Sequence, residues 1–213
     1  MDRVWYVAYG SNLGTDRFRC YLAGGRPVGG TRTYVGCRDT SDPAETFGLE
    51  VTGELVFAGE SAVWGGGLAF FDPHGTGSVA CRAYLVTAEQ LADVAAQELW
   101  LEPGGGFART LVGVLPELGE KHRLGPGRYE TVVRVGTRDG VPLLTVTSHD
   151  IHGLTLAAPS APYLRSIARG LREAHHWDDA RIAAYLSAAR GARGTWTSAA
   201  VLEALQSASD ASV

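Results

Sequence analysis

Hydrophobic residues dominate the start of the chain and then stop abruptly. Residues 4–9 form an apolar, β-branched and aromatic run, which residues 10–12 (Gly-Ser-Asn) end. Such a run is typical of a buried strand, and the small residues after it predict a tight turn with exposed backbone N–H groups. A short helix is expected next, with Thr15 as its N-cap and glycines 24–25 at its end. Taken alone, this pattern favours an ordinary N-terminal strand and turn over a binding site.

The middle of the chain alternates short apolar runs with glycine-rich stretches. Residues 24–53 are rich in Gly, Arg, Thr and Asp and predict a long irregular segment, of a kind that is often functional or mobile. Strands are expected over 54–58, 64–73 (entered through a glycine-rich loop), 79–86, 110–114, 129–135 and 141–147, with a loop over 115–128. Residues 138–140 (Arg-Asp-Gly) predict a hairpin between the last two strands.

One helix in this region carries an unexpected charge. Residues 87–90 (Thr-Ala-Glu-Gln) have the spacing of a capping box, so a helix is expected to begin there. Leu91, Val94 and Ala95 form its apolar stripe, and the next position on that stripe is Glu98. A lone glutamate at such a position usually lies in a frayed helix end or pairs with an arginine. Because an inward carboxylate is costly unless something uses it, we interpret Glu98 as a candidate general acid/base.

Helices are predicted at the C-terminal end of the chain. Ser160, Asp178 and Thr197 each precede a helical pattern of apolar residues and are suitable N-caps. Strands in the middle and helices at the end favour an α+β fold. We expect a single domain over 1–206, followed by a disordered Ser/Ala-rich tail over 207–213.

The amino-acid composition argues against several classes of function. The 213 residues are 45% hydrophobic and 20% charged, as in an ordinary globular protein, and the net charge of −4 gives no support for nucleic-acid or anionic-membrane binding. Neither a signal peptide nor a membrane helix is recognisable. Cys20, Cys37 and Cys81 are odd in number and scattered, which favours reduced thiols over disulfides or zinc. We therefore expect a cytoplasmic location and no membrane or nucleic-acid partner.

Two common kinds of catalytic site lack support. Ser11 directly follows its glycine, so the turn does not fit the Gly-x-Ser-x-Gly nucleophile elbow, and no phosphate-binding or dinucleotide-binding glycine motif is present. His149, Asp150 and His152 lie close together, but without a metal-ligand spacing such as His-Glu-x-x-His. Such residues beside turns are commonly solvated or act as caps. We predict no metal site, so the turn and Glu98 remain as the features that a function must explain.

Three separated motifs carry further information. They are Tyr9-Gly10-Ser11-Asn12-Leu13, Trp64-x-Gly66-Gly67-x-Ala69 and Pro159-Ser160-x-x-Tyr163-Leu164-x-x-Ile167-x-x-Gly170. In this order, with Glu98 at the matching spacing between the second and the third, they resemble the gamma-glutamylcyclotransferase-like family. The resemblance extends roughly over residues 4–190, and it rests on the combination because each motif is short.

The resemblance implies an α+β fold with a small mixed β-barrel flanked by helices. It also implies a reaction without cofactor: the α-amine of a γ-glutamyl compound attacks its own side-chain carbonyl, which forms 5-oxoproline and releases an amine. The general acid/base carboxylate of the family falls on Glu98. Its substrate-holding loop falls on Tyr9, Gly10, Ser11, Asn12 and Leu13, to which we add Tyr163 of the third motif as a substrate-binding candidate. The implied partner is a small-molecule γ-glutamyl substrate.

The residues suit this chemistry. One carboxylate can take the proton of the α-ammonium and return it to the leaving amine. Backbone N–H groups of the turn can hold the substrate carboxylate or the developing oxyanion. No nucleophilic cysteine, serine or metal is needed.

Two departures from the family pattern leave the substrate open. The human-type pattern has glycine after the glutamate, whereas Leu99 and Trp100 follow Glu98 here, so we expect the helix to continue. Segments 24–53 and 115–147 match no family motif. Two alternatives therefore stay open: a hydrolase or acyl transferase on the same fold, and a non-catalytic relative that only binds a small molecule. The sequence gives neither the natural substrate nor the oligomeric state.

Overall fold

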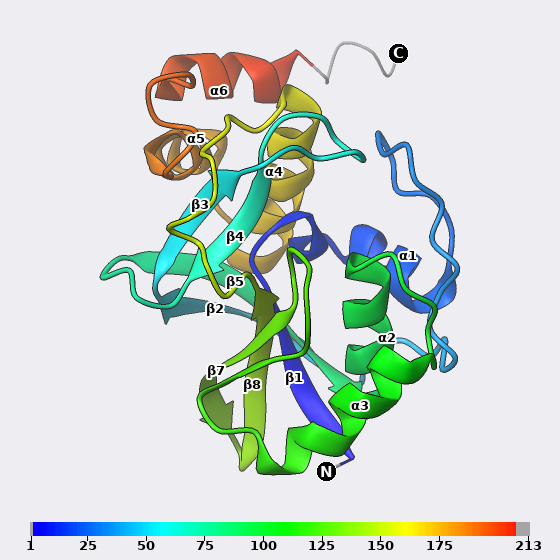
Figure 1. The fold of residues 1–213 in the computed structure, drawn as a ribbon. Helices are drawn as coiled ribbons and strands as arrows, with labels where there is room; N and C mark the ends of the chain where they lie inside the picture. The colour runs from blue at the N-terminus through cyan, green and yellow to red at the C-terminus, as the bar shows by residue number, and fades with distance from the viewer. Residues whose placement is uncertain (1, 208–213) are drawn as a thin grey trace.

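The first strand of the chain lies inside the main sheet of the protein. In the computed structural model, which describes residues 2–207, this strand is β1 (Arg3–Ala8), and its residues 4–8 are all buried (Figure 1). It pairs antiparallel with β5 on one side and parallel with β8 on the other. The six strands follow in the order β2 (Thr46–Thr52), β5 (Ser78–Thr87), β1, β8 (Val141–Thr147), β7 (Thr131–Arg138) and β6 (Lys121–Arg123). Burial on both faces explains the uninterrupted apolar run of β1.

The sheet stays open, so the expected β-barrel is wrong, whereas the α+β class is confirmed. Among residues 2–207, the six-stranded sheet ends at β2 and β6, and β3 (Glu54–Ala58) and β4 (Leu68–Asp72) form a separate two-stranded sheet. A side chain links the two sheets: Thr147 Oγ1 accepts the N–H of Phe71 at 3.1 Å and donates to its carbonyl at 2.8 Å. The contact between β8 and β4 is therefore made by a side chain, and among residues 2–207 no strand-to-strand pairing joins the two sheets into a barrel.

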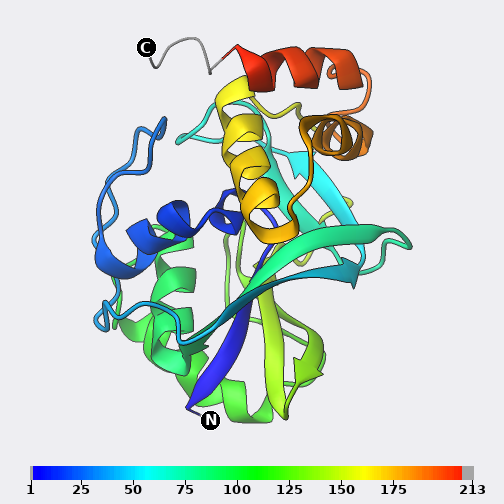
Figure 2. The same cartoon turned by 180° about the vertical axis from the view of Figure 1, so that it is seen from behind.

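Alternate residues of β1 pack into two different hydrophobic cores. Val4, Tyr6 and Ala8 pack with α1, α2 and α3, whereas Trp5 and Val7 pack with the β3–β4 sheet and with α4, α5 and α6. Figures 1 and 2 show the first three helices along one flank and the last three together at the other end of the molecule. The helices are α1 (Thr15–Ala23), α2 (Ala88–Glu98), α3 (Gly106–Val114), α4 (Ala161–His175), α5 (Asp179–Ala188) and α6 (Ser198–Gln206), with 3-10 turns η1 (Ser11–Leu13) and η2 (Leu115–Glu117).

Most predicted helix starts are confirmed by their caps. Thr87 Oγ1 accepts the N–H of Gln90 at 3.0 Å, and Gln90 Oε1 accepts the N–H of Thr87 at 3.0 Å, so the capping box of α2 is complete. The later helices use the same type of bond, from an N-cap side chain to a main-chain N–H of the first turn, at Ser160, Asp178 and Thr197.

Two local expectations near helices are wrong. Thr15 is the first residue of α1 and not its N-cap, a position that Gly14 holds without a side-chain bond. The stretch 110–114 is part of α3 and not a strand. Ala108 and Leu111 are fully buried at helical spacing against the core that α2 shares, and this packing outweighs the β propensity of the stretch.

The predicted hairpin between β7 and β8 is confirmed. Asp139 and Gly140 have φ values of 52° and 77°, as a two-residue hairpin turn requires. Within 115–128, where a loop is expected, β6 pairs with β7 instead.

The expected tail beyond Ser207 lies outside the described residues. No helix of the described part combines the length and hydrophobicity needed to cross a membrane.

The irregular segment expected over 24–53 is wrong in its last part, which forms β2. Buried polar side chains of α2 hold the remaining irregular segment, 24–45. Gln90, Asp93 and Gln97 lie on the same buried side of the helix. Their partners are main-chain groups of this segment and of the end of α1, namely the carbonyls of Asp39, Ser41 and Tyr21 and the N–H groups of Gly36 and Arg38. A segment without periodic hydrophobicity is fixed in this way by hydrogen bonds.

Asp93 is the most connected of these side chains. It is fully buried and accepts from the main-chain N–H of Arg38 at 3.0 Å, from the Arg38 guanidinium at 3.0 Å and from the N–H of Gly104 at 2.7 Å. The carboxylate therefore joins α2 to the irregular segment and to the loop before α3. Breaking such a buried, hydrogen-bonded pair leaves its partners unsatisfied.

Replacing Asp93 by alanine is expected to lower the free energy of unfolding by about 2–4 kcal/mol, because the bonds to Arg38 and Gly104 lose their acceptor. Urea unfolding followed by circular dichroism measures this change. Asp42→Ala is the matched control, since Asp42 forms an exposed ion pair with Arg19 at 3.5 Å and should contribute less than about 0.5 kcal/mol. Equal losses in the two variants would contradict the anchoring role of Asp93.

Candidate functional site

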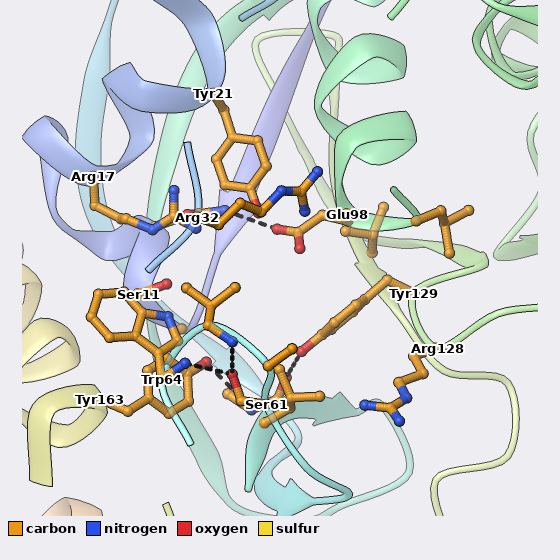
Figure 3. A pocket seen from close by; sticks show the side chains of 18 of the residues that line it. Ser11, Arg17, Tyr21, Arg32, Ser61, Trp64, Glu98, Arg128, Tyr129 and Tyr163 are labelled. Carbon is orange, nitrogen blue, oxygen red and sulfur yellow. Dashed lines mark hydrogen bonds between the residues drawn. The ribbon is translucent and has the colours of Figure 1, made fainter. Parts of the chain in front are cut away.

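A cavity of about 440 Å³ opens where the turn after β1, the end of α2 and the start of α4 approach one another (Figure 3). Its size is within the range of small-molecule sites. The glycine-rich loop before β4, the irregular segment 24–45 and residues 127–129 before β7 also contribute to its wall. The predicted site residues that line it are Glu98, Tyr9, Gly10, Ser11, Asn12 and Tyr163.

The turn after β1 is fixed at its centre and leaves several N–H groups unpaired. Tyr84 Oη donates to the carbonyl of Asn12 at 2.8 Å, and the N–H of Leu13 donates to the carbonyl of Gly10 at 3.0 Å. Among residues 2–207, no hydrogen bond uses the main-chain N–H of Gly10, Ser11 or Asn12. A carbonyl or anionic group of a ligand can accept from such N–H groups.

Leu13 differs from the other predicted site residues because it does not line the cavity. Its side chain is fully buried in the core that contains α4. A Cβ added at Gly170 of α4 would overlap with Leu13, so the helix approaches the turn as closely as only glycine permits. The structure thus places Leu13 outside the cavity wall, where it anchors the turn against α4.

The Glu98 carboxylate faces the turn. Asn12 Nδ2 donates to Glu98 Oε1 at 3.3 Å and to Tyr6 Oη at 3.0 Å. Figure 3 shows the Glu98 carboxylate pointing into the cavity. Glu98 is only partly buried, and among the described residues it takes part in no ion pair. The structure thus brings together the two features that the sequence singles out, although they lie 86 residues apart.

Helix α2 ends at Glu98, so the expectation that it continues is wrong. Leu99 is its C-cap, and Trp100 has a left-handed backbone with a φ of 63°. The N–H of Trp100 donates to the carbonyl of Gln97 at 3.1 Å. This conformation turns the chain out of the helix and places the Trp100 side chain, which is 63% exposed, at the edge of the cavity.

The side of the cavity away from Glu98 is aromatic (Figure 3). The rings of Tyr163 and Trp64 stack with centroids 5.8 Å apart, and Tyr163 Oη accepts the N–H of Ala69 at 3.4 Å. Ser160 Oγ, at the start of α4, donates to the carbonyl of Trp64 at 2.7 Å. The second and third sequence motifs are joined by these contacts and together form this wall.

The phenols in the wall are neutral groups. Burial raises the pKa of Tyr163, while its hydrogen bond to Ala69 acts in the opposite direction. Burial also raises the pKa of Tyr6, with the charge of Glu98 as the second cause. Tyr9 Oη donates to the carbonyl of Val146 at 2.8 Å and so is already engaged within the protein.

A cluster of aromatic and cationic side chains forms another part of the wall, and the sequence reasoning missed it. Each of its two guanidinium carbons lies 3.8–4.5 Å from two ring centroids, and the rings of Tyr21 and Tyr34 contact each other with centroids 4.4 Å apart. The members of this aromatic–arginine cluster are Tyr21, Arg17, Tyr34, Arg32 and Trp100.

One member of the cluster could be recognised in the sequence. Arg17 lies among the buried residues of α1, one turn before Tyr21, and so is a charge in an apolar stripe just as Glu98 is. Arg32 and Tyr34 give no such signal, because they belong to the irregular segment and have no periodic neighbours.

The histidines lie outside the cavity wall. His149 Nδ1 contacts Glu130 Oε1 at 2.6 Å, and His152 Nε2 lies 3.5 Å from a carboxylate oxygen of Asp72. Within residues 2–207, no group of three or more His, Cys, Asp or Glu side chains could hold a metal ion. The ionisable side chains found in the wall are carboxyl, guanidinium and phenol groups.

Comparisons with known proteins find a related sequence and several similar solved structures. No family model matches the chain. Histone deacetylase 5 of Arabidopsis thaliana is 30% identical over 201 residues, which cover 87% of this chain but only 30% of that protein. The chain thus spans less than a third of the length of the curated relative it matches.

Two of the similar solved structures have TM-scores below 0.5. An uncharacterized protein from Homo sapiens has a TM-score of 0.48 and 18% identity, with 82% of each chain covered. A gamma-glutamyl cyclotransferase has a TM-score of 0.47 and 17% identity, with 81% of this chain and 80% of that chain covered. The second structure carries the name of the family that the sequence motifs resemble.

Close contact between Gly10 and Tyr163 gives a test of the cavity geometry. A Cβ at Gly10 would lie 3.1 Å from Tyr163 Oη, so Gly10→Ala is expected to lower the free energy of unfolding by about 1 kcal/mol. Tyr163→Phe removes the oxygen, and the double variant should show a favourable coupling of about 0.5–1 kcal/mol in urea unfolding.

Gly14→Ala is the control for this cycle. Its Cβ would make only ordinary contacts at 3.7 Å or more, so no coupling to Tyr163→Phe is expected. If the coupling of Gly10→Ala is no larger than that of Gly14→Ala, the close approach does not exist in solution.

Proposed function

We propose that the protein is an enzyme of the γ-glutamyl cyclotransferase type, which converts a γ-glutamyl amide into 5-oxoproline and a free amine. The observation that supports this best is the Glu98 carboxylate, which Asn12 holds at 3.3 Å beside a turn with unpaired N–H groups. A proton-transferring group and a donor for the carbonyl oxygen are the two elements that this cyclisation needs. The resemblance of three sequence motifs, all of which reach the cavity, supports the same reaction.

In the proposed reaction, Glu98 first takes a proton from the α-ammonium of the substrate. The α-nitrogen then attacks the γ-carbonyl carbon, which closes a five-membered ring and moves charge to the carbonyl oxygen. N–H groups of residues 10–12 stabilise that oxygen. As the bond between the γ-carbon and the leaving nitrogen breaks, Glu98 returns the proton to this nitrogen. The ring nitrogen still carries two hydrogens, so it gives its second proton to Glu98, and this proton leaves with the free amine as an ammonium. The atoms then balance without water.

The cavity wall contributes by holding the substrate in a bent form. The α-nitrogen reaches the γ-carbon only when the glutamyl side chain folds back on itself, and a well-oriented intramolecular attack corresponds to an effective molarity of about 10⁵–10⁸ M. Trp64 and Tyr163 present a flat apolar surface against which the two methylene groups can pack. Their neutral, buried character also keeps bulk water from the carbonyl.

Glu98→Gln is expected to reduce 5-oxoproline release by about 10²–10⁴ fold, because the amide cannot transfer the proton. The measurement incubates the protein with a panel of γ-glutamyl amines and amino acids and detects products by mass spectrometry. Glu102→Gln is the matched control, since Glu102 is exposed in the loop after α2 and should keep wild-type activity.

Two results would contradict the proposal. One is the absence of 5-oxoproline from every member of the panel, and the other is equal activity of Glu98→Gln and wild type. Running the assay in ¹⁸O-labelled water identifies a hydrolase, because hydrolysis places the label in released glutamate whereas cyclisation adds none to 5-oxoproline.

Asn12→Asp is expected to lower kcat/KM for 5-oxoproline release by about tenfold, because an aspartate cannot donate to Glu98 Oε1 and places a like charge beside it. Asn12→Ala, which only removes the donated hydrogen bond, should lower it by less. Rates at subsaturating substrate measure both effects. Wild-type rates in both variants would show that Asn12 does not act on the proton-transferring group.

A further inference from the structure

Arg17 is a buried cation with much of its hydrogen-bonding capacity unused. Its side chain comes from α1, is 7% exposed and lines the cavity (Figure 3). Nη2 donates to Tyr34 Oη at 2.7 Å, whereas Nε and Nη1 have no hydrogen-bond partner among the described residues. Unpaired buried donors on a charged group destabilise the folded protein. A ligand that accepts from them would remove this cost.

The guanidinium is also held in place. The rings of Tyr21 and Tyr34, which contact each other with centroids 4.4 Å apart, lie 4.5 and 4.4 Å from the guanidinium carbon, and the bond to Tyr34 Oη fixes one of its donors. Nη2 carries two hydrogens and gives one to Tyr34, so one complete two-donor edge of the guanidinium is left whichever hydrogen it uses. A two-donor edge matches the two oxygens of a carboxylate.

The cavity thus contains a carboxylate and a guanidinium that do not pair with each other. Neither Glu98 nor Arg17 takes part in an ion pair within residues 2–207. Both line the same cavity and both face the region of the turn. Two opposite charges held apart in this way are complementary to a molecule that carries an ammonium and a carboxylate on one carbon atom.

We propose that Arg17 binds the α-carboxylate of the substrate while Glu98 faces the α-ammonium on the same carbon. This assignment rests on the proposed function and restricts its substrates to γ-glutamyl compounds whose α-carboxylate is free. It also leaves the N–H groups of Gly10, Ser11 and Asn12 for the γ-carbonyl oxygen. A neutral carboxamide at the α-position would not supply the anion that Arg17 lacks, so it would bind weakly.

A pair of substrates tests the assignment. A γ-glutamyl anilide and its α-carboxamide analogue differ only at the α-group, and both can cyclise. For the wild type, kcat/KM is expected to be about 10²-fold higher for the free acid, and in Arg17→Gln this preference should fall below about 5-fold. Arg19→Gln is the control on the same helix: Arg19 is exposed and pairs with Asp42, so its loss should leave the preference unchanged.

The ratio between the two substrates separates recognition from folding. A poorly folded Arg17→Gln protein would lose activity on both substrates alike. Tyr34→Phe is a milder second variant, because it keeps the ring and removes only the oxygen that holds Nη2, and it should reduce the preference by about 3–10 fold. Equal wild-type rates on acid and carboxamide, or an unchanged preference in Arg17→Gln, would overturn the assignment.

A binding measurement distinguishes this assignment from the proposed function. Calorimetry compares 5-oxoproline with 2-pyrrolidinone, the same ring without the carboxylate. The wild type is expected to bind 5-oxoproline at least about tenfold more tightly, and Arg17→Gln should remove the difference. No difference in the wild type overturns the role of Arg17 even if the protein forms 5-oxoproline. A retained difference without any turnover supports Arg17 and overturns the proposed function alone.

Discussion

Buried polar side chains that need partners determine the architecture around the cavity. Helix α2 is buried along almost its whole length, yet it carries Gln90, Asp93 and Gln97. Because water does not reach these groups, the protein has to satisfy them. The irregular segment does so with its own main chain, and a stretch without a hydrophobic pattern thereby adopts one conformation. Arg32 and Tyr34 reach the cavity wall as a consequence.

Inside the cavity, by contrast, some buried polar groups have no hydrogen-bond partner. Among the described residues, buried side-chain atoms without a partner occur on Asn12, Arg17 and Glu130, and the first two line the cavity. A folded protein is stable by only about 5–15 kcal/mol, so unmatched buried donors and acceptors are a considerable cost. Their concentration in one place is typical of a site whose polar groups are completed by a ligand, where stability is lost in favour of function.

Features with a local cause were predictable from the sequence, and features that depend on distant partners were not. The strand β1, the capping box at 87–90 and the turn at 138–140 each depend on a few neighbouring residues, and all three are confirmed. Barrel closure depends on which strands meet, and the Thr147 link to β4 cannot be seen in the sequence. Glu98 stands out because α2 has a regular apolar stripe. Arg17 is the same kind of anomaly in a shorter helix, where the stripe is harder to recognise.

The aromatic–arginine cluster connects the base of the cavity with its edge. Tyr21, at the base, is fully buried, whereas Trp100, at the edge, is exposed and holds a left-handed conformation that costs a non-glycine residue about 1–2 kcal/mol. Stacking on Arg32 at 3.8 Å offsets part of that cost. Arg32 and Arg17 both contact the ring of Tyr34, so Trp100 and the buried guanidinium belong to one continuous set of contacts. Because Trp100 directly follows the C-cap of α2, the end of this helix fixes both the Glu98 carboxylate and the aromatic edge of the cavity.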